Sequence, residues 1–369
     1  MRILVVNTGS SSLKLRLLDG TDALAGSLDL DAWAGPQEAD RIKEAAAGMG
    51  RVDAIAHRVV HGGRDFTGPV VIDPAVRERI AALTDLAPLH QPRVLAGIDA
   101  AAQALPDVPA VACFDTAFHA GLPAAAATYA VPAQWRQRWG LRRYGFHGLS
   151  HAYAARRAAE LTGRPPDRLR VVTCHLGAGA SLTAVAGGRS VDTTMGFTPL
   201  EGLVMATRSG SIDPGMLLWL LDRGRLGREE LSDALEHHSG LAGLAGLADG
   251  SGDMREVVAA ARDGRPAAEL ALAVYLHRLR RETAAMAAAT GGLDALVFTG
   301  GVGENAPQVR AGAADGLGFL GVRIDGDRNR EARPDAELTA AGASVRTFVV
   351  TAREDLEMAR QVRSLLSPG

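Results

Sequence analysis

The chain of 369 residues is more than twice the ~150 residues typical of one domain, so two domains are expected. Its 47% hydrophobic and 22% charged residues are typical of a globular protein and exclude a long disordered or fibrous region. The 40 basic and 42 acidic residues leave a net charge of −2, which argues against a nucleic-acid or anionic-membrane surface.

Two further features bear on the compartment. Cys113 and Cys174 each lie in an apolar run, which predicts buried reduced thiols rather than a disulfide framework. The first apolar run stops at Asn7, too early for a signal peptide, and no stretch of about eighteen apolar residues suggests a membrane span. We therefore expect a cytoplasmic protein without a membrane partner.

Two segments have the same pattern of strand, small-residue turn and strand. Residues 2–19 contain the turn Thr8-Gly-Ser-Ser-Ser12, and residues 168–192 contain Leu176-Gly-Ala-Gly-Ala180. When the segments are overlaid, Ser12-Leu13 falls on Ser181-Leu182. This repeat predicts a duplicated domain in which each copy opens with a β-hairpin.

After each hairpin, strand patterns alternate with helical periodicity. Buried strands are predicted at 53–60, 108–114, 293–299 and 343–350. Helices are predicted at 74–83, 91–105, 149–162, 215–222, 228–237, 266–290 and 354–366. The alternation predicts mixed α/β sheets covered by helices, with a ligand cleft between the two domains.

Several nucleotide-binding classes are excluded by the lysines. Lys14 and Lys43 are the only two, and neither follows a Gly-x-x-x-x-Gly sequence or lies in a Val-Ala-Ile-Lys strand, so a P-loop enzyme and a protein kinase are excluded. Gly316-Leu-Gly-Phe-Leu-Gly321 matches a dinucleotide fingerprint but follows a helical stretch, which indicates a turn at a helix end.

Three glycine-rich turns, each at the end of a predicted strand, can surround phosphate oxygens with backbone N–H groups. They are 7–12, 175–179 and 299–305, and Pro307 after the third suits a first helical turn. Lys14 adds positive charge beside the first turn. A plain hairpin turn is the alternative for the first of these turns taken alone.

Four polar residues lie within or beside apolar segments: Arg58, Asp115, His147 and Arg208. Strand ends are where α/β proteins keep catalytic groups, whereas solvated arginines and a structural histidine are the alternatives. His57 and His61 are spaced by four residues but have no third ligand nearby in the sequence, so we do not expect a zinc site.

Together these segments resemble the acetate kinase family along nearly the whole chain. The resemblance rests on motifs at 6–14, 57–63, 87–90, 114–119, 144–148, 174–177, 192–202, 207–210 and 301–305. It implies α/β architecture with duplicated ribonuclease-H-like, actin-like ATPase domains and an interdomain cleft. The implied domains are 1–149 plus 355–369, and 150–354.

The resemblance also implies the site residues. Mg²⁺ would be held by Asn7 and Glu354. Asp115, His147, Arg208 and Arg58 would be catalytic, with Arg58 also binding substrate. ATP or ADP would contact Lys14, His175, Leu176, Gly177, Ala178, Gly179, Asp253, Met254, Arg255, Gly301, Val302, Gly303, Glu304 and Asn305. The acyl methyl group would be enclosed by Val60, Leu89, Phe146 and Pro199.

The implied activity is reversible, in-line phosphorylation of acetate by ATP, giving acetyl phosphate, in a homodimer that binds no nucleic acid. A kinase for propionate or another short-chain carboxylate, a weakened nucleotide-binding relative and a sugar kinase are the alternatives. Two positions depart from the family pattern: Ala178 replaces an asparagine and Ser211 replaces an aspartate. Loss of the amide at position 178 removes a potential hydrogen bond to phosphate.

Overall fold

The computed structural model describes residues 1–8, 12–31, 39–88 and 90–367. These residues form two compact units. Unit 1 comprises 1–121, 146–153 and 353–369, and unit 2 comprises 122–145 and 154–352. The units differ from the domains predicted from the sequence in grouping 122–145 with the second half; the predicted domain assignment stays a prediction.

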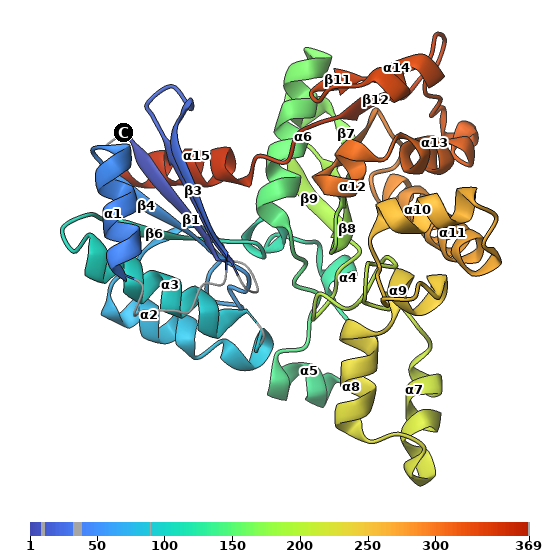
Figure 1. Ribbon diagram of the computed structural model, residues 1–369, viewed down its shortest axis with the longest axis horizontal. Coiled ribbons are helices and arrows are strands. Elements are labelled where there is room, and N and C mark those ends of the chain that lie inside the picture. The colour runs from blue at the N-terminus through green and yellow to red at the C-terminus, as the bar shows by residue number, and fades with distance from the viewer. Residues whose placement is uncertain (9–11, 32–38, 89, 368–369) are drawn as a thin grey trace. The chain divides into compact units, whose positions relative to one another are not determined.

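Unit 1 is built around a six-stranded sheet in the order β3-β2-β1-β4-β6-β5 (Figure 1). Its elements are β1 (Ile3–Thr8), β2 (Ser12–Leu18), β3 (Leu24–Asp31), α1 (Ala39–Met49), β4 (Ala54–Val59), β5 (Val70–Val71), α2 (Pro74–Ala81), α3 (Gln91–Ala104), β6 (Ala110–Phe114) and α15 (Glu354–Leu366). Helix α6 (Gly148–Thr162) begins in unit 1 and continues into unit 2.

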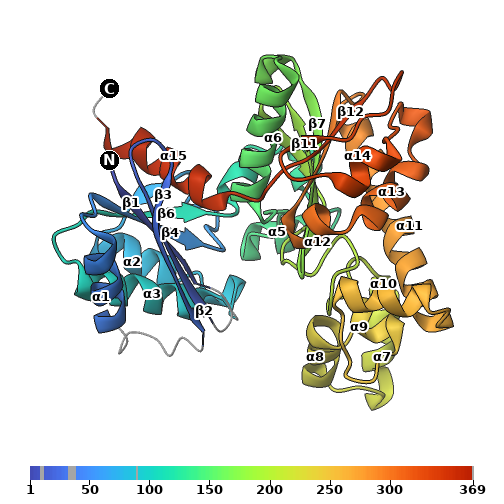
Figure 2. The same ribbon diagram turned by 45° about the horizontal axis from the view of Figure 1, so that its top comes forward.

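Unit 2 contains the second six-stranded sheet, in the order β11-β12-β10-β7-β8-β9 (Figure 2). Its strands are β7 (Arg170–Leu176), β8 (Ala180–Ala186), β9 (Arg189–Thr193), β10 (Ala295–Thr299), β11 (Ala336–Glu337) and β12 (Arg346–Val349). Its helices are α4 (Ala124–Ala127), α5 (Ala133–Trp139), α7 (Pro214–Leu221), α8 (Arg228–His237), α9 (Gly240–Ala245), α10 (Met254–Arg262), α11 (Pro266–Ala289), α12 (Gly300–Asn305), α13 (Pro307–Asp315) and α14 (Gly326–Glu331).

The two sheets have the same topology. In each, an antiparallel meander (β1-β2-β3 or β7-β8-β9) continues into parallel strands (β1-β4-β6 or β7-β10-β12), and a short antiparallel strand closes the far edge. The duplication predicted from the two hairpins is therefore confirmed. The parallel strands are largely buried on both faces, which explains the mostly apolar sequences of β6 and β10.

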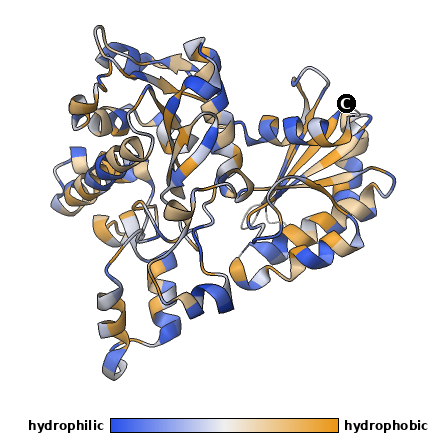
Figure 3. Cartoon of the chain, turned by 180° about the vertical axis from the view of Figure 1, so that it is seen from behind, coloured by the Kyte–Doolittle hydropathy of each residue, from blue (hydrophilic) through white to orange (hydrophobic). Residues whose placement is uncertain are grey.

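The helices of unit 1 cover both faces of its sheet. On one face, Leu4 and Ile55 pack with residues of α1 and α3. On the other, Val5 and Ala56 pack with Met358 of α15. Figure 3 shows the strands of this sheet in apolar colours. Strand alternation thus places Arg58, two residues after Ala56, on the face covered by α15.

Most predicted elements are confirmed, and α15 spans the residues expected of it. The prediction of a third glycine-rich turn is wrong, because Gly300–Asn305 forms the short helix α12 directly after β10. Helix α13 begins at Pro307, and the Gly316–Gly321 segment follows its end, as predicted. Among the described residues no helix has both the length and the apolar character needed to cross a membrane.

Candidate functional site

The parallel strands of unit 1 bring charged side chains together at their carboxyl ends. Arg58 lies in β4, and Asp115 directly follows β6, held there by its N–H donating to Val59 O at 2.9 Å. The register that pairs Val6 of β1 with His57 places Asn7 level with Arg58. This is the sheet edge at which open α/β sheets bind ligands.

Arg58 is the centre of this cluster. Its Nε and Nη2 donate to Asp115 Oδ1 and Oδ2 at 3.1 and 2.7 Å, a bidentate contact. Its Nη1 lies 3.4 Å from Glu354 Oε2 at the start of α15. The Arg58 side chain is only 21% exposed and that of Asp115 is 2% exposed, so a solvated surface arginine is excluded.

The electrostatics of the cluster follow from its burial. Burial alone would lower the pKa of Arg58, but the charges of Asp115 and Glu354 outweigh it and raise the pKa. Burial raises the pKa of Glu354, and Asp115 adds repulsion that Arg58 opposes. Arg58 therefore stays cationic in a site with little water.

His147 lies beside this cluster in an uncommon backbone conformation. Its φ is +55°, in the left-handed region, directly before α6. The N–H of Gly148 donates to Asp115 O at 2.9 Å, and a Cβ at position 148 would lie 2.1 Å from that oxygen. Only glycine permits this approach, which fixes His147 next to the end of β6.

The residues predicted to enclose the acyl group fall in different places. Val60 follows β4, and Phe146 is buried, with its carbonyl bound by a ring nitrogen of His119 at 3.1 Å. Pro199 belongs to unit 2. Leu89 lies outside the described residues, as do Gly9, Ser10 and Ser11 of the first glycine-rich turn. The pocket stays a prediction.

Lys14 belongs to unit 1, where it is exposed on β2 and pairs in register with Asn7. Its charge acts on Glu354. The other residues predicted to bind nucleotide all belong to unit 2.

Unit 2 contains a cavity of about 420 Å³. Eight of the predicted nucleotide-binding residues line it: Gly177, Ala178, Asp253, Met254, Arg255, Gly301, Val302 and Asn305. His175, Leu176, Gly179, Gly303 and Glu304 are absent from its lining. Sequence reasoning missed Ala206, Leu241, Gly252, Tyr275, Ala306 and Gln308, most of which are small or apolar and give no chemical signal.

Helix α12 forms one wall of the cavity and is held in place by a close backbone contact and by hydrogen bonds. The first residue, Gly300, has φ +78°, and a Cβ there would lie 2.7 Å from Leu176 O. Glu304 Oε1 accepts hydrogen bonds from Gly300 N at 3.1 Å and from Ala352 N at 2.9 Å. Buried Arg310 donates to the carbonyls of Gly303 and Glu304, both at 2.8 Å. Glu304 thus orients α12 rather than facing the cavity.

Other lining residues come from the start of α10 and from the segments around Ala178 and Ala206. Asp253 caps α10 by accepting a hydrogen bond from Arg255 N at 2.8 Å, and its carboxylate also binds the Arg255 guanidinium. Ala206 N donates to Ala178 O at 3.1 Å, which joins the glycine turn after β7 to the loop that carries Arg208.

Arg208 is half-buried and bound on three sides. Its Nε lies 3.2 Å from Glu236 Oε2 of α8, and its Nη1 donates to Pro199 O at 3.3 Å. Met205 Sδ lies 3.8 Å from the same Nη1. The alternative of a fully solvated arginine is therefore excluded for Arg208 as well.

The metal prediction can be tested against the donor set. Mg²⁺ takes oxygen ligands and usually combines one or two carboxylates with water and phosphate. The Asn7 amide, level with Arg58, and the half-buried Glu354 carboxylate beside Arg58 fit such partial coordination. Among the described residues no group of three His, Cys, Asp or Glu side chains could form an all-protein metal cage.

Comparisons with known proteins agree with the motifs. The acetokinase family model matches residues 37–360. The acetate kinase of Leifsonia xyli subsp. xyli is 46% identical over 398 aligned positions, covering 100% of this chain and 99% of the relative.

Solved structures give the same result. Porphyromonas gingivalis acetate kinase superposes with a TM-score of 0.92 at 34% identity, covering 99% of this chain and 100% of that one. A propionate kinase from Francisella tularensis gives 0.90 at 35% identity, covering 98% of each. The predicted duplicated ribonuclease-H-like, actin-like fold is confirmed, and the chain belongs to the acetokinase family.

Proposed function

We propose that this chain transfers the γ-phosphoryl group of ATP directly to acetate, forming acetyl phosphate and ADP, and that it catalyses the reverse reaction. The observation that carries the proposal is Arg58, a permanently charged guanidinium fixed at the strand ends of unit 1 by Asp115 and Glu354. Such a cation is suited to an anionic acceptor.

The chemistry needs charge compensation more than a base. A carboxylic acid with a pKa near ~4 to 5 is already ionised at neutral pH, so acetate is a nucleophile without proton removal. The obstacle is repulsion between acetate and the transferring phosphoryl group, whose charge spreads over three equatorial oxygens. We propose that Arg58, His147 and Arg208 stabilise this charge.

Asp115 is not suited to proton abstraction. Both its carboxylate oxygens accept hydrogen bonds from Arg58. In the proposed reaction Asp115 therefore orients the arginine that binds the acceptor, and a sugar kinase, which needs a carboxylate free to act as base towards a hydroxyl, is disfavoured.

The cavity of unit 2 is the proposed nucleotide site. Its small lining residues leave room for a base and ribose, and Ala178 lies at the turn after β7. The Gly177 N–H is bound to Gly179 O at 3.0 Å, so the proposed phosphate donors of this turn are the N–H groups of Ala178 and Gly179. From unit 1, Lys14 is proposed to add positive charge for the phosphates.

Asn7 and Glu354 are proposed to hold Mg²⁺ with the nucleotide phosphates. When bound, the ion would neutralise negative charge on the β- and γ-phosphate oxygens. Chelation by EDTA should abolish turnover, and added Mg²⁺ should restore it. In Glu354→Gln the Mg²⁺ concentration for half-maximal rate should rise.

Propionate is the second candidate acceptor, because the propionate kinase from Francisella tularensis has the same fold at similar identity. One methylene in an apolar pocket changes selectivity by only ~1 to 3 kcal/mol, so both acids remain plausible substrates by chemistry. The homodimer and the cytoplasmic location stay predictions, and sedimentation velocity tests the former.

The decisive experiment measures ATP-dependent acyl phosphate, trapped as hydroxamate, with acetate, propionate and butyrate. The proposal expects the highest kcat/KM with acetate. A higher value with propionate would favour the second candidate. ATP binding without acyl phosphate from any acid would instead indicate a non-catalytic nucleotide-binding relative.

A further inference from the structure

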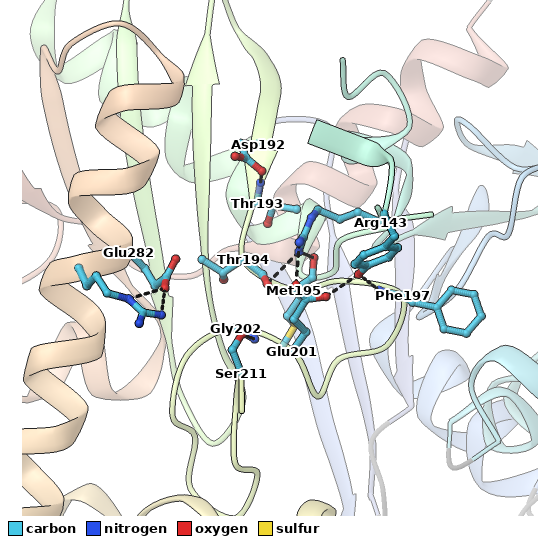
Figure 4. Close-up of polar contacts among 12 residues, drawn as sticks. Arg143, Asp192, Thr193, Thr194, Met195, Phe197, Glu201, Gly202, Ser211 and Glu282 are labelled. Atoms are coloured by element: carbon cyan, nitrogen blue, oxygen red, sulfur yellow. Dashed lines mark hydrogen bonds and ion pairs between the residues drawn. The ribbon is translucent and has the colours of Figure 1, made fainter. Parts of the chain in front are cut away.

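A half-buried ion pair in unit 2 lies between two segments that lead to proposed reaction residues. Arg143 Nη2 donates to Glu201 Oε1 at 2.7 Å (Figure 4). The hydroxyl of Tyr129 donates to the other oxygen, Oε2, of the same carboxylate. The Arg143 guanidinium also lies 5.5 Å from the centre of the Tyr129 ring, a cation–π contact.

Arg143 and Tyr129 also hold the backbone of the loop between β9 and Glu201. Arg143 Nη1 donates to Thr194 O at 3.1 Å and to Met195 O at 3.0 Å, as Figure 4 shows. Phe197 N donates to the Tyr129 hydroxyl at 2.8 Å. The loop therefore has bound backbone groups on both sides of Gly196.

Gly196 shows how closely this loop is packed. A Cβ there would lie 1.7 Å from Glu201 Oε2 and 2.1 Å from the Tyr129 hydroxyl. Its carbonyl accepts a hydrogen bond from Tyr144 N at 3.0 Å. A side chain at 196 would displace the ends of the Glu201 and Tyr129 side chains, so glycine at this position leaves room for their contact.

Arg143 and Tyr129 each keep the protonation state that lets them donate to Glu201. Burial lowers the pKa of Arg143, but Glu201 outweighs it and the pKa is raised, so the cation persists. Burial and the hydrogen bond to Glu201 raise the pKa of Tyr129, so the phenol keeps its proton and donates. In a partly buried network whose members are all bound, loss of one member leaves a charged or polar group without its partner.

The loop leads directly to Arg208. Pro199, two residues before Glu201, provides the carbonyl that accepts from Arg208 Nη1. After Glu201, Gly202 and Ser211 bind each other twice, through Gly202 N to Ser211 Oγ at 3.1 Å and Ser211 N to Gly202 O at 2.9 Å (Figure 4). These two hydrogen bonds join the ends of the segment 202–211, which contains Arg208.

Arg143 also precedes His147 by four residues in the chain, and the intervening Tyr144 and Gly145 N–H groups both donate to Gly196 O, at 3.0 and 3.3 Å. One network thus anchors the backbone that leads to His147 and the backbone that leads to Arg208.

We propose that Arg143, Glu201 and Tyr129 are positioning residues for phosphoryl transfer, which set the place of Arg208 and of the backbone at 143–145 that leads to His147, without touching substrate. The inference rests on the catalytic roles proposed for those two residues. It assigns a function to three side chains that the motif analysis did not single out, joined across 72 and 58 positions of sequence.

The test uses Glu201→Gln, Arg143→Lys and Tyr129→Phe. Because misplacement by about 1 Å can cost 100-fold in rate, Glu201→Gln and Arg143→Lys should lower kcat by about 10- to 100-fold, and Tyr129→Phe by less. The KM for ATP should stay within about twofold, because Ala206 of the cavity is held separately by Ala178 O and Ala242 N.

Glu337→Gln is the matched control. Both carboxylate oxygens of Glu337 accept hydrogen bonds from Arg346 in unit 2, at 2.9 and 2.6 Å, and Glu337 is likewise half-buried. Glu337→Gln and Glu201→Gln should lower the midpoint temperature of thermal unfolding by similar amounts. Glu337→Gln should leave kcat unchanged. Combining Tyr129→Phe with Glu201→Gln should lower kcat by less than the product of the two single effects, since both substitutions weaken the contact between Tyr129 and residue 201.

Arg208→Ala separates a failure of the positioning role from a failure of the catalytic role proposed for Arg208. If it abolishes turnover while Glu201→Gln and Tyr129→Phe keep normal kcat, the positioning role is refuted and the proposed role of Arg208 stands. If Arg208→Ala itself keeps normal kcat, the proposed catalytic role fails, and the positioning role fails with it. A fall in kcat of Glu337→Gln equal to that of Glu201→Gln would also refute the proposal.

Discussion

Ala178 is the position at which a single substitution should strengthen nucleotide binding. It lies at the turn after β7, in the wall of the unit 2 cavity, and its carbonyl is fixed by Ala206 N. Asparagine at this position would direct an amide towards the proposed phosphate site from a backbone that is already ordered. The change adds a donor without disturbing the two flanking glycines.

The expected gain in binding free energy is the difference between a hydrogen bond gained and a side chain ordered. A hydrogen bond to a charged group contributes about 1.5 to 3 kcal/mol. Ordering the asparagine side chain costs about 1 kcal/mol, which leaves about 0.5 to 2 kcal/mol. Because 1.36 kcal/mol is a factor of ten, Ala178→Asn should lower the Kd for ATP by about 2- to 30-fold.

Isothermal titration calorimetry with ATP, ADP and adenosine measures the effect. The gain should appear for the two phosphorylated ligands and be absent for adenosine. Ala206→Asn is the matched control, since it adds the same amide to a different part of the cavity wall. An unchanged Kd for ATP in a folded Ala178→Asn protein, or an equal gain for adenosine, would refute the placement of phosphate at this turn.

Three further outcomes are expected. Asp115→Asn should lower kcat by about 100-fold or more, because Arg58 loses its bidentate partner; near-normal turnover in steady-state assays would disprove the orienting role. Arg310→Met should lower the free energy of unfolding by about 3 kcal/mol or more, since buried carbonyls of α12 lose their donor; urea titration measures this, and unchanged stability would contradict it. Burial lowers the pKa values of His57, His61 and His119 to about 4, below the ordinary 6.5, so these rings bind protons more readily when unfolded. Stability should fall as pH drops from 6.5 to 4, by up to about 1.4 kcal/mol per pH unit for each ring, and flat urea midpoints across this range would exclude it.

Much of the fold could be predicted because its parallel strands are buried on both faces. The sequences of β6 and β10 are therefore almost wholly apolar and are followed by Asp115 and Gly300. The strand β3 and the helix α1 were not predicted. Helix α1 buries only Ala39, Ile42 and Ala46, which is too narrow an apolar stripe to distinguish from a loop.

Helix α12 could not be predicted for a different reason. Its sequence, Gly-Gly-Val-Gly-Glu-Asn, has low helix propensity and is typical of a turn. Tertiary contacts from Arg310 and the Glu304 carboxylate hold it in place, and local sequence does not reveal these partners.

The site was predictable where chemistry and strand ends coincide, as at Arg58 and Asp115. It was not predictable where function depends on packing. Tyr275 lines the cavity through an otherwise ordinary buried helix position, and Glu201 meets Tyr129 from 72 positions away. Such pairings arise from topology and leave no local pattern.

The oxygen that Glu304 shares between Gly300 and Ala352 also determines where this chain could be recombined with a relative. Residues 350–352 are bound to β10, Asp335 and Glu304 in turn, so they belong structurally to the half that precedes them. A chimaera that exchanges the C-terminal helix should therefore be joined after Ala352. A crossover placed a few residues earlier would take Glu304 and the backbone N–H at position 352, which donates to it, from different parents.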